Sequence, residues 1–249
     1  MQGISMEKII TIQNLRRFAY CNDAICRRPI KGVVIYFYGL GGQFLFDEDT
    51  DEGRMYAEEG VLYLIPYQNP WAWMNRQTVD LTNELLDVLF AAYELPYNLP
   101  IVSAGKSMGG LSALVYTAYA KRTPAACVTN CPVCDLPYHF TERPDLPRTL
   151  YSAFHTYEGS LEEALRSASP IHLLEQLPVM TQYSIFHCEE DQAVSKQIHS
   201  DRFVEMLRQN HNVQYHCVPG RGHCDLTEEM WQSYHACALQ TIQNKNGLP

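Results

Sequence analysis

The stretch over residues 99–121, LPIVSAGKSMGGLSALVYTAYAK, decides the fold. Its apolar start, Leu99–Ser103, predicts a buried β-strand, and the alanine- and leucine-rich segment Leu111–Lys121 predicts a helix. Between them, residues 105–109 read GKSMG and match G-x-S-x-G, a pattern typical of a sharp strand-to-helix turn that exposes its serine. Glycines are needed in such a turn because neighbouring backbones leave no room for Cβ atoms. We therefore predict that Ser107 projects its hydroxyl above the carboxyl end of a sheet.

Short apolar runs on both sides of this stretch predict the rest of the sheet. Their nearly continuous apolar character suits parallel strands that are covered on both faces. The first two runs are separated by little more than two residues, so we expect them to pair antiparallel at the sheet edge. The predicted strands are Lys8–Ile12, Leu15–Tyr20, Gly32–Tyr38, Val61–Pro66, Leu99–Ser103, Ala125–Thr129, Tyr183–Cys188 and Val213–Val218.

Helical segments alternate with the later strands. Thr78–Glu94 places leucines on one face, Ser195–Gln209 repeats this pattern, and Thr227–Asn244 is expected to close the chain as a helix. Alternating strands and helices imply right-handed crossovers. The predicted fold class is therefore α/β, with an eight-stranded, mostly parallel sheet and helices on both of its faces.

One connection is much longer than a usual crossover. About fifty residues separate the strands predicted at Ala125–Thr129 and Tyr183–Cys188. Prolines and charges in Pro137–Pro147 favour an irregular loop, and Ser160 with Glu163 fits a capping box at a helix start. We expect residues 135–178 to form a small lid on a single domain that spans residues 1–249.

Composition excludes several classes of protein. The chain has 249 residues, of which 46% are hydrophobic, so it can form a sizeable core and is not disordered. A formal net charge of -9 repels phosphate backbones, so we expect no nucleic-acid partner. No apolar run is long enough to cross a bilayer, and Met1–Ile10 lacks an apolar signal-peptide core. With nine cysteines, an odd number, the chain is expected to carry reduced thiols in the cytoplasm.

Three residues predict nucleophilic catalysis. A serine hydroxyl is a weak nucleophile until a base takes its proton. His223, on the loop after the last strand, is the candidate base for Ser107, and Asp191, just past the strand Tyr183–Cys188, is the candidate orienting acid. All three follow parallel strands at their carboxyl ends, where α/β sheets place their sites. Their order, Ser then Asp then His, is the hydrolase order.

Other acids near these positions are alternatives to Asp191. Asp225 lies on the same loop as His223 and is poorly placed to orient it, while Glu189 and Glu190 are expected to face solvent. We therefore retain Asp191 as the predicted acid.

Stabilising a negative charge that develops on a carbonyl oxygen needs two backbone N–H groups. Met108 supplies one at the start of a helix, where the helix dipole adds to the effect. By its position in the glycine-rich segment after the strand Gly32–Tyr38, Leu40 is the candidate for the other. The alternative interpretation of that segment is a flexible glycine-rich linker.

Three aromatic residues follow strands at their carboxyl ends. Tyr38 directly precedes the glycine-rich segment, and Trp71 and Trp73 follow the strand Val61–Pro66. We expect Trp71 and Trp73 to form an aromatic wall of the pocket for the acyl or leaving group, and Tyr38 to contact the substrate. The alternative for the two tryptophans is that they anchor a loop.

Together these motifs resemble the α/β-hydrolase superfamily over nearly the whole chain. The segments SPIH at 169–172, FHCEEDQAV at 186–194 and PGRGH at 219–223 are similar to the catalytic domain of prolyl-oligopeptidase-like serine hydrolases. The resemblance implies hydrolysis of esters, amides or peptides through an acyl-enzyme, with no metal or organic cofactor. In prolyl oligopeptidases a tyrosine at the position of Leu40 supplies an oxyanion hydroxyl, which leucine cannot do. In addition, the hydrolase core uses up the chain, so no propeller domain is expected.

These two differences favour a hydrolase of small esters. The alternative is an aminopeptidase or oligopeptidase of the same fold, which would take short peptides. The oligomeric state stays open.

A second hypothesis starts from Cys131-Pro132-Val133-Cys134, a C-x-x-C motif that could carry out thiol redox chemistry or bind zinc. The motif is not followed by an evident helix, and no second pair of ligands with zinc spacing is present. We therefore interpret both cysteines as structural thiols. A non-catalytic protein on the same scaffold is the remaining alternative.

Overall fold

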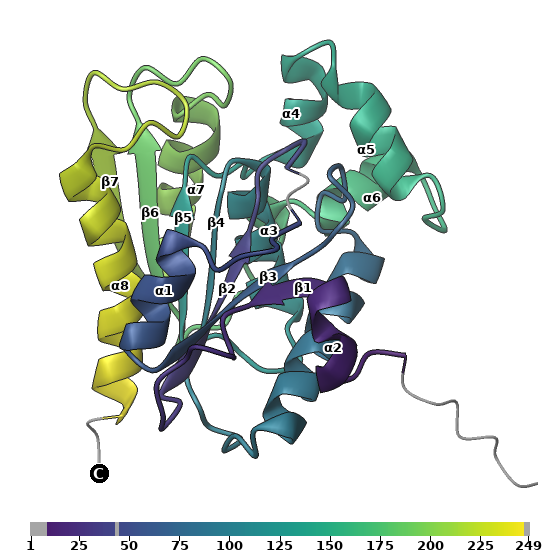
Figure 1. Cartoon of the computed structure of the whole chain (residues 1–249). Coiled ribbons are helices and arrows are strands. Elements are labelled where there is room, and N and C mark those ends of the chain that lie inside the picture. Colours follow the sequence, from purple (N-terminus) through teal and green to yellow (C-terminus); the bar gives the residue numbers. More distant parts are fainter. Residues whose placement is uncertain (1–8, 43–44, 247–249) are drawn as a thin grey trace, which may run out of the picture.

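A mostly parallel sheet organises the chain (Figure 1). The computed structural model describes residues 9–42 and 45–246. In this part of the chain seven strands lie in the order β1-β3-β2-β4-β5-β6-β7, and only β1 runs antiparallel to its neighbour. The strands are β1 Ala19–Cys21, β2 Gly32–Phe37, β3 Val61–Pro66, β4 Ile101–Lys106, β5 Ala126–Asn130, β6 Gln182–Cys188 and β7 Asn212–Val218.

The predicted pair of N-terminal strands is wrong, so seven described strands replace the eight expected. Lys8 lies outside the described residues, and Ile12–Arg17 forms the 3-10 helix η1 instead of strand. The Asn14 side chain accepts the N–H of Thr11 at 2.8 Å, which starts this helical turn. The chain becomes extended only at Ala19, where β1 pairs with β3 and not with a preceding strand.

Helices cover both faces of the sheet, as predicted (Figure 1). The larger core cluster packs α2, α3 and α7 on one face, and a smaller cluster packs α1 and α8 on the other. These helices are α1 Asp51–Glu58, α2 Arg76–Ala92, α3 Met108–Tyr119, α7 Arg202–Leu207 and α8 Glu228–Asn246. The sequence analysis missed α1, and the helix expected over Ser195–Gln209 is shorter, because a π-helix at Gln197–Asp201 (η3) precedes α7. None of the helices in the described part of the chain is long and apolar enough to span a bilayer.

The long connection after β5, here called the insert (residues 135–178), contains three helices above the carboxyl edge of the sheet (Figure 1). They are α4 Leu136–Glu142, α5 Leu146–Phe154 and α6 Leu161–Ser167, followed by the one-turn η2 Pro170–His172. The irregular loop expected at Pro137–Pro147 is therefore wrong. Each of these two prolines lies in the first turn of a helix, where the missing N–H is tolerated. The capping box is confirmed, with Ser160 and Glu163 bonded in both directions.

Candidate active site

The turn after β4 has the strained geometry that its glycines permit. Ser107 has φ 56° and ψ −125°, a conformation that residues with a side chain rarely adopt. A Cβ atom at Gly109 would lie 1.9 Å from the carbonyl oxygen of Phe37, and one at Gly105 would lie 2.2 Å from the Gly109 oxygen. Both positions therefore have room for glycine only, and their close packing fixes Ser107 between β4 and α3.

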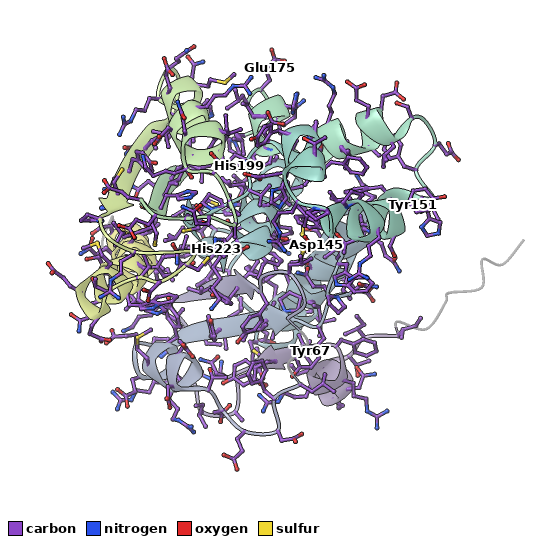
Figure 2. The ribbon with its side chains drawn as sticks, turned by 90° about the horizontal axis from the view of Figure 1, so that it is seen from above. Tyr67, Asp145, Tyr151, Glu175, His199 and His223 are labelled. Carbon is purple, nitrogen blue, oxygen red and sulfur yellow. The ribbon has the colours of Figure 1, made fainter. Side chains whose placement is uncertain are left out.

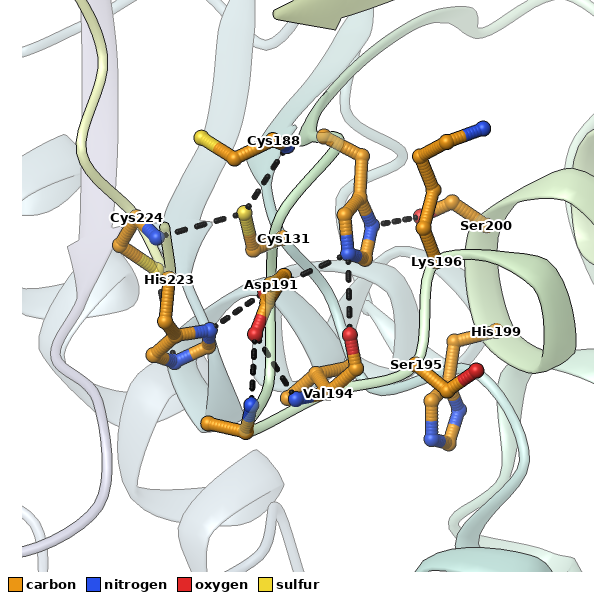
Figure 3. A network of polar contacts seen from close by, with 12 residues as sticks. Cys131, Cys188, Asp191, Val194, Ser195, Lys196, His199, Ser200, His223 and Cys224 are labelled. Carbon is orange, nitrogen blue, oxygen red and sulfur yellow. Dashed lines mark hydrogen bonds and ion pairs between the residues drawn. The ribbon is translucent and has the colours of Figure 1, made fainter. Parts of the chain in front are cut away.

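The three residues predicted for nucleophilic catalysis meet at this point. His223 Nε2 lies 2.8 Å from Ser107 Oγ. On the other side of the ring, His223 Nδ1 lies 2.6 Å from Asp191 Oδ2 (Figure 3). An ionised carboxylate can only accept, so Nδ1 carries the hydrogen and, in the neutral ring, Nε2 is the acceptor that faces the serine hydroxyl. The side chain of Asp191 is fully buried, and that of His223 is 27% exposed. The His223 imidazole thus contacts the buried Asp191 carboxylate on one side and the Ser107 hydroxyl on the other.

Three further contacts hold the Asp191 carboxylate in place (Figure 3). Oδ1 accepts the N–H groups of Ala193 at 2.8 Å and Val194 at 2.9 Å. His187 Nε2 lies 3.3 Å from Oδ2 and 3.2 Å from the Val194 oxygen, and its Nδ1 lies 2.6 Å from Ser200 Oγ. Since the Val194 oxygen can only accept, His187 donates from Nε2, and it fixes both the carboxylate and its loop. Sequence reasoning missed this role of His187 and Ser200, for which no sequence signal exists beyond the spacing of His187 and Asp191.

These contacts shift two pKa values in opposite directions. Burial alone would raise the pKa of Asp191, but the hydrogen bonds from His187 and His223 outweigh it and hold this pKa well below its usual value. Burial alone would lower the pKa of His223, but the hydrogen bond to Asp191 outweighs it, and the pKa of His223 rises from 6.5 to about 9. The acid is therefore ionised at neutral pH, and the imidazole binds a proton more strongly than an ordinary histidine.

The two predicted oxyanion donors lie beside Ser107. A Cβ atom at Gly39 would be 3.5 Å from the Cβ of Ser107, so the segment that carries Leu40 lies against the serine. Met108 is the first residue of α3 and has no helical carbonyl behind it to bond its N–H. In the described ranges, the N–H of Leu40 also has no hydrogen-bond partner. The segment that carries Leu40 and the first residue of α3 thus both adjoin Ser107.

The three aromatic residues predicted at the substrate pocket lie in different surroundings. The indole of Trp73 is 1% exposed and donates to Thr149 Oγ1 at 3.1 Å, so it belongs to the core under the insert and corrects the expectation of a pocket wall. Trp71 is 40% exposed and lines a cavity of about 500 Å³ between the β3–α2 loop and α5. Tyr38 is half-buried, with its ring stacked on that of Phe46. Burial raises the pKa of Tyr38 to about 12.

A second cavity, of about 330 Å³, reaches His223. It is bounded by the Arg143 side chain of the insert, by Gln192 and Ala193 of the acid loop, and by Gly222 and His223. Its volume is in the range of small-molecule sites. A small molecule can therefore approach His223 between the insert and the two loops that carry Asp191 and His223.

The alternative acids do not contact His223. Asp225 pairs with Arg221 at 3.1 Å on the surface, and Glu189 and Glu190 are both exposed. Among the described residues, Asp191 is therefore the carboxylate that bonds the His223 ring.

The C-x-x-C motif does not bring its two thiols together. Cys131 belongs to the smaller core cluster on the α8 face, and Cys134 belongs to the larger cluster on the opposite face. Both are fully buried. The sequence neighbours of Cys131 thus do not decide its chemistry; its spatial neighbours are the backbone N–H groups of Cys188 and Cys224.

The insert contains a polar cluster that the sequence analysis missed. Glu142 Oε2 lies 2.6 Å from His139 Nδ1 and 3.0 Å from His199 Nε2, and Glu142 Oε1 accepts the N–H of Ser195 at 3.0 Å. Burial alone would raise the pKa of Glu142, but the hydrogen bonds from both histidines outweigh it and hold the pKa well below its usual value. The cluster ties α4 to the loop that follows Asp191.

The ligand chemistry of this cluster argues against an ion. His199 Nδ1 accepts the N–H groups of Cys134 and Asp135, both at 3.1 Å, so Nε2 keeps its hydrogen and has no lone pair for a metal. Hydrogen bonds alone account for the three side chains. Two other groups of donor atoms within 4.8 Å of one another share Cys131 with the triad, namely Cys131–His223–Cys224 and Cys131–His187–Asp191. Their histidine and carboxylate atoms are already used in the bonds described above.

Comparisons with known proteins show which folds the chain resembles. The chain resembles the solved structure of Est1E from Butyrivibrio proteoclasticus (TM-score 0.57, 18% identity, covering 90% of this chain and 94% of that one). It also resembles a crystal structure of puromycin hydrolase (TM-score 0.67, 17% identity, covering 89% of this chain and 35% of that one). A further similar structure is oligopeptidase B from Leishmania major (TM-score 0.65, 14% identity, covering 87% of this chain and 34% of that one). The chain thus spans about a third of these two proteins. None of the curated protein sequences compared with it matches.

At these identities the solved structures show the α/β-hydrolase fold and no more. The model of the prolyl oligopeptidase family matches residues 90–238, a range that includes Ser107, Asp191 and His223. This match covers more than half of the chain, which therefore belongs to the prolyl oligopeptidase family and is a serine hydrolase.

Proposed function

We propose that the chain hydrolyses small carboxylic esters through an acyl-enzyme formed on Ser107. The observation that carries the proposal is the pair of hydrogen bonds of His223, at 2.8 Å to the serine hydroxyl and 2.6 Å to the buried carboxylate. An imidazole held in this way can accept the serine proton at Nε2 while Nδ1 keeps its own. No other serine of the described ranges makes such a contact with His223.

The mechanism follows from this arrangement. Ser107 Oγ attacks the carbonyl carbon, and His223 takes its proton and then gives it to the leaving alcohol. The N–H groups of Leu40 and Met108 bind the oxygen that becomes negative in the tetrahedral intermediate. Asp191 holds the imidazole in its tautomer and stabilises the imidazolium. Water, activated by His223, then releases the acyl group.

Two observations support a small ester as substrate. The cavity at His223 measures about 330 Å³, and the apolar side chain of Leu40 offers no hydroxyl to add to the two backbone donors. A second candidate, hydrolysis of a peptide or aminoacyl amide, is favoured by the similarity to puromycin hydrolase and oligopeptidase B. Rates on p-nitrophenyl esters and on aminoacyl p-nitroanilides, measured with one preparation, distinguish the two candidates.

Covalent labelling with a small alkyl fluorophosphonate tests the nucleophile directly. We expect intact mass to show one adduct on the wild type and on Ser152→Ala, a control on the exposed surface of α5. Ser107→Ala should give none, and His223→Ala should react far more slowly because the base is gone. An unlabelled wild type, or a label that persists in Ser107→Ala, would overturn the proposal.

A further inference from the structure

Thiols from three parts of the chain gather behind the triad (Figure 3). Cys131 follows β5, Cys188 ends β6, and Cys224 directly follows His223. All nine cysteines of the chain are free. The parallel sheet brings these three to one edge because the carboxyl ends of β5, β6 and β7 are neighbours.

The contacts within this group select two of the sulfurs. Cys131 Sγ accepts the N–H of Cys188 at 3.5 Å and that of Cys224 at 3.4 Å. Cys224 Sγ lies 3.6 Å from His223 Nε2, the same nitrogen that bonds Ser107. The sulfurs of Cys131 and Cys224 lie within 4.8 Å of each other and of a ring nitrogen of His223.

Exposure distinguishes the roles of the two thiols. Cys131 is fully buried, whereas Cys224 is partly exposed, so a small oxidant dissolved in water reaches Cys224 first. The attacking species in thiol oxidation is the thiolate. His223 Nε2, which lies 3.6 Å from Cys224 Sγ, is the neighbouring base that can take the thiol proton.

We propose that Cys224 is a modification site for hydroperoxides and that Cys131 resolves its oxidised form as a disulfide. In the first step the Cys224 thiolate attacks the peroxide O–O bond; the sulfur becomes a sulfenic acid, and hydrogen peroxide is reduced to hydroxide, which takes up a proton as water. In the second step the Cys131 thiol attacks this sulfur, the S–S bond forms, and a second water leaves. Overall two thiols lose two electrons and two protons to one hydrogen peroxide.

A disulfide between Cys131 and Cys224 displaces His223 through the backbone. A disulfide holds its sulfurs about 2.05 Å apart, closer than two free thiols can approach. Cys131 is packed in the core, so residue 224 has to move, and His223 precedes it directly in the chain. The movement takes His223 Nε2 away from Ser107 Oγ. Loss of hydrolysis rests on the proposed function, whereas the sulfur chemistry does not.

The test treats the full chain with hydrogen peroxide and then with dithiothreitol, comparing the wild type with single cysteine variants, each relative to its own untreated activity. Displacing the base should cost at least about a hundredfold in ester hydrolysis, because a positioned base contributes 10²–10⁴-fold. We expect the wild type and Cys217→Ser, a control at an exposed cysteine of β7, to lose this activity and to regain it with dithiothreitol. Cys224→Ser should keep its activity. Cys131→Ser should stop at a sulfenic acid on Cys224, which dimedone traps.

Peptide mapping by mass spectrometry decides the proposal without reference to activity. A linkage between the peptides of Cys131 and Cys224 supports it even if the ester assay shows no hydrolysis, in which case the proposed function fails alone. A linkage between Cys131 and Cys188, no linkage, or equal inactivation of Cys224→Ser would overturn it. If the serine variants do not fold, iodoacetamide labelling of the wild type replaces them: Cys224 should be alkylated before Cys131 and Cys188, and any other order contradicts the proposal.

Discussion

Two carboxylates in this molecule each bridge two histidines, and only one of them belongs to a site with a nucleophile. Asp191 Oδ2 contacts His223 at 2.6 Å and His187 at 3.3 Å; Glu142 Oε2 contacts His139 at 2.6 Å and His199 at 3.0 Å. Figure 2 labels one histidine of each group, His223 and His199. The chemistry of the pairs is the same, so the carboxylate–histidine contact alone does not make a catalytic site.

The difference lies in what the second nitrogen of each histidine meets. His223 turns Nε2 to a serine hydroxyl, and its ring borders an open cavity, whereas His199 turns Nδ1 to two backbone N–H groups in the core. His139 packs its ring edge-on against Trp73. A histidine whose second nitrogen is saturated or covered cannot accept a substrate proton. We therefore expect the Asp191 group to act in catalysis and the Glu142 group to act in stability.

The largest expected effect separates the two groups by activity. His223→Ala should lower kcat/KM for ester hydrolysis by about 10³-fold or more, because it removes the proposed base. Its melting temperature should stay close to that of the wild type, since the side chain is partly exposed. His155→Ala, at an exposed histidine of the insert, is the matched control and should retain its activity. Equal losses in both variants would contradict the assignment.

The second largest expected effect is a loss of stability with little change in activity, the reverse of His223→Ala. Glu142→Ala leaves the donors of His139, His199 and Ser195 without their acceptor, and unpaired buried donors cost about 1–3 kcal/mol each. We expect a loss of roughly 2–4 kcal/mol in the free energy of unfolding, which denaturant titration measures. Ester hydrolysis by the fraction that remains folded should change by less than about tenfold.

A surface glutamate of the insert provides the control for this change. Glu162 pairs with Arg166 at 3.0 Å, and both side chains are more than half exposed. Glu162→Ala should therefore alter the free energy of unfolding by no more than about 0.5 kcal/mol. If the two substitutions destabilised the chain equally, the Glu142 cluster would have no special structural role.

The pH profile of activity sharpens the comparison further. Only unprotonated His223 can act as a base, and its pKa is raised to about 9, so kcat/KM should rise with pH and level off above about pH 9. Asp191→Asn removes the hydrogen bond that raises this pKa, so the rate should fall and the inflection should move to lower pH. A wild-type inflection near 6.5 that Asp191→Asn leaves in place would disprove this cause.

The smallest expected effect is a loss of stability in acid. Burial lowers the pKa of His139 below 6.5, so the unfolded chain binds a proton there more strongly than the folded chain. Stability should therefore fall as pH drops below about 6.5, and fall again below about 4.5, where the unfolded chain protonates Glu142 first. Melting temperatures between pH 7 and pH 5 measure the first step. His139→Gln should reduce this decline, and an unchanged decline would assign it to other groups.

The predictions that succeeded rest on local signals at strand ends. The alternation of strands and helices predicts the parallel sheet, and a parallel sheet places the carboxyl ends of its strands at one edge. Ser107, Asp191 and His223 each follow such an end, so their chain positions are enough to predict that they meet. The helical turn at Ile12–Arg17 and the helix α4 were not predicted, because each begins at a hydrogen bond from a backbone N–H to one side chain. These side chains are Asn14 and Asp135.

By itself, therefore, the sequence determined the fold class, the strained turn at Ser107 and the three residues that meet there. Only the tertiary structure decided that Trp73 is buried, that Glu142 ties the insert to the acid loop, and that Cys131 faces Cys224 and not Cys134. The physical reason is the separation in sequence over which the interactions act. Periodicity and capping act over a few residues and are written in consecutive letters, whereas Cys131 and Cys224 are joined by the strand order of the whole sheet.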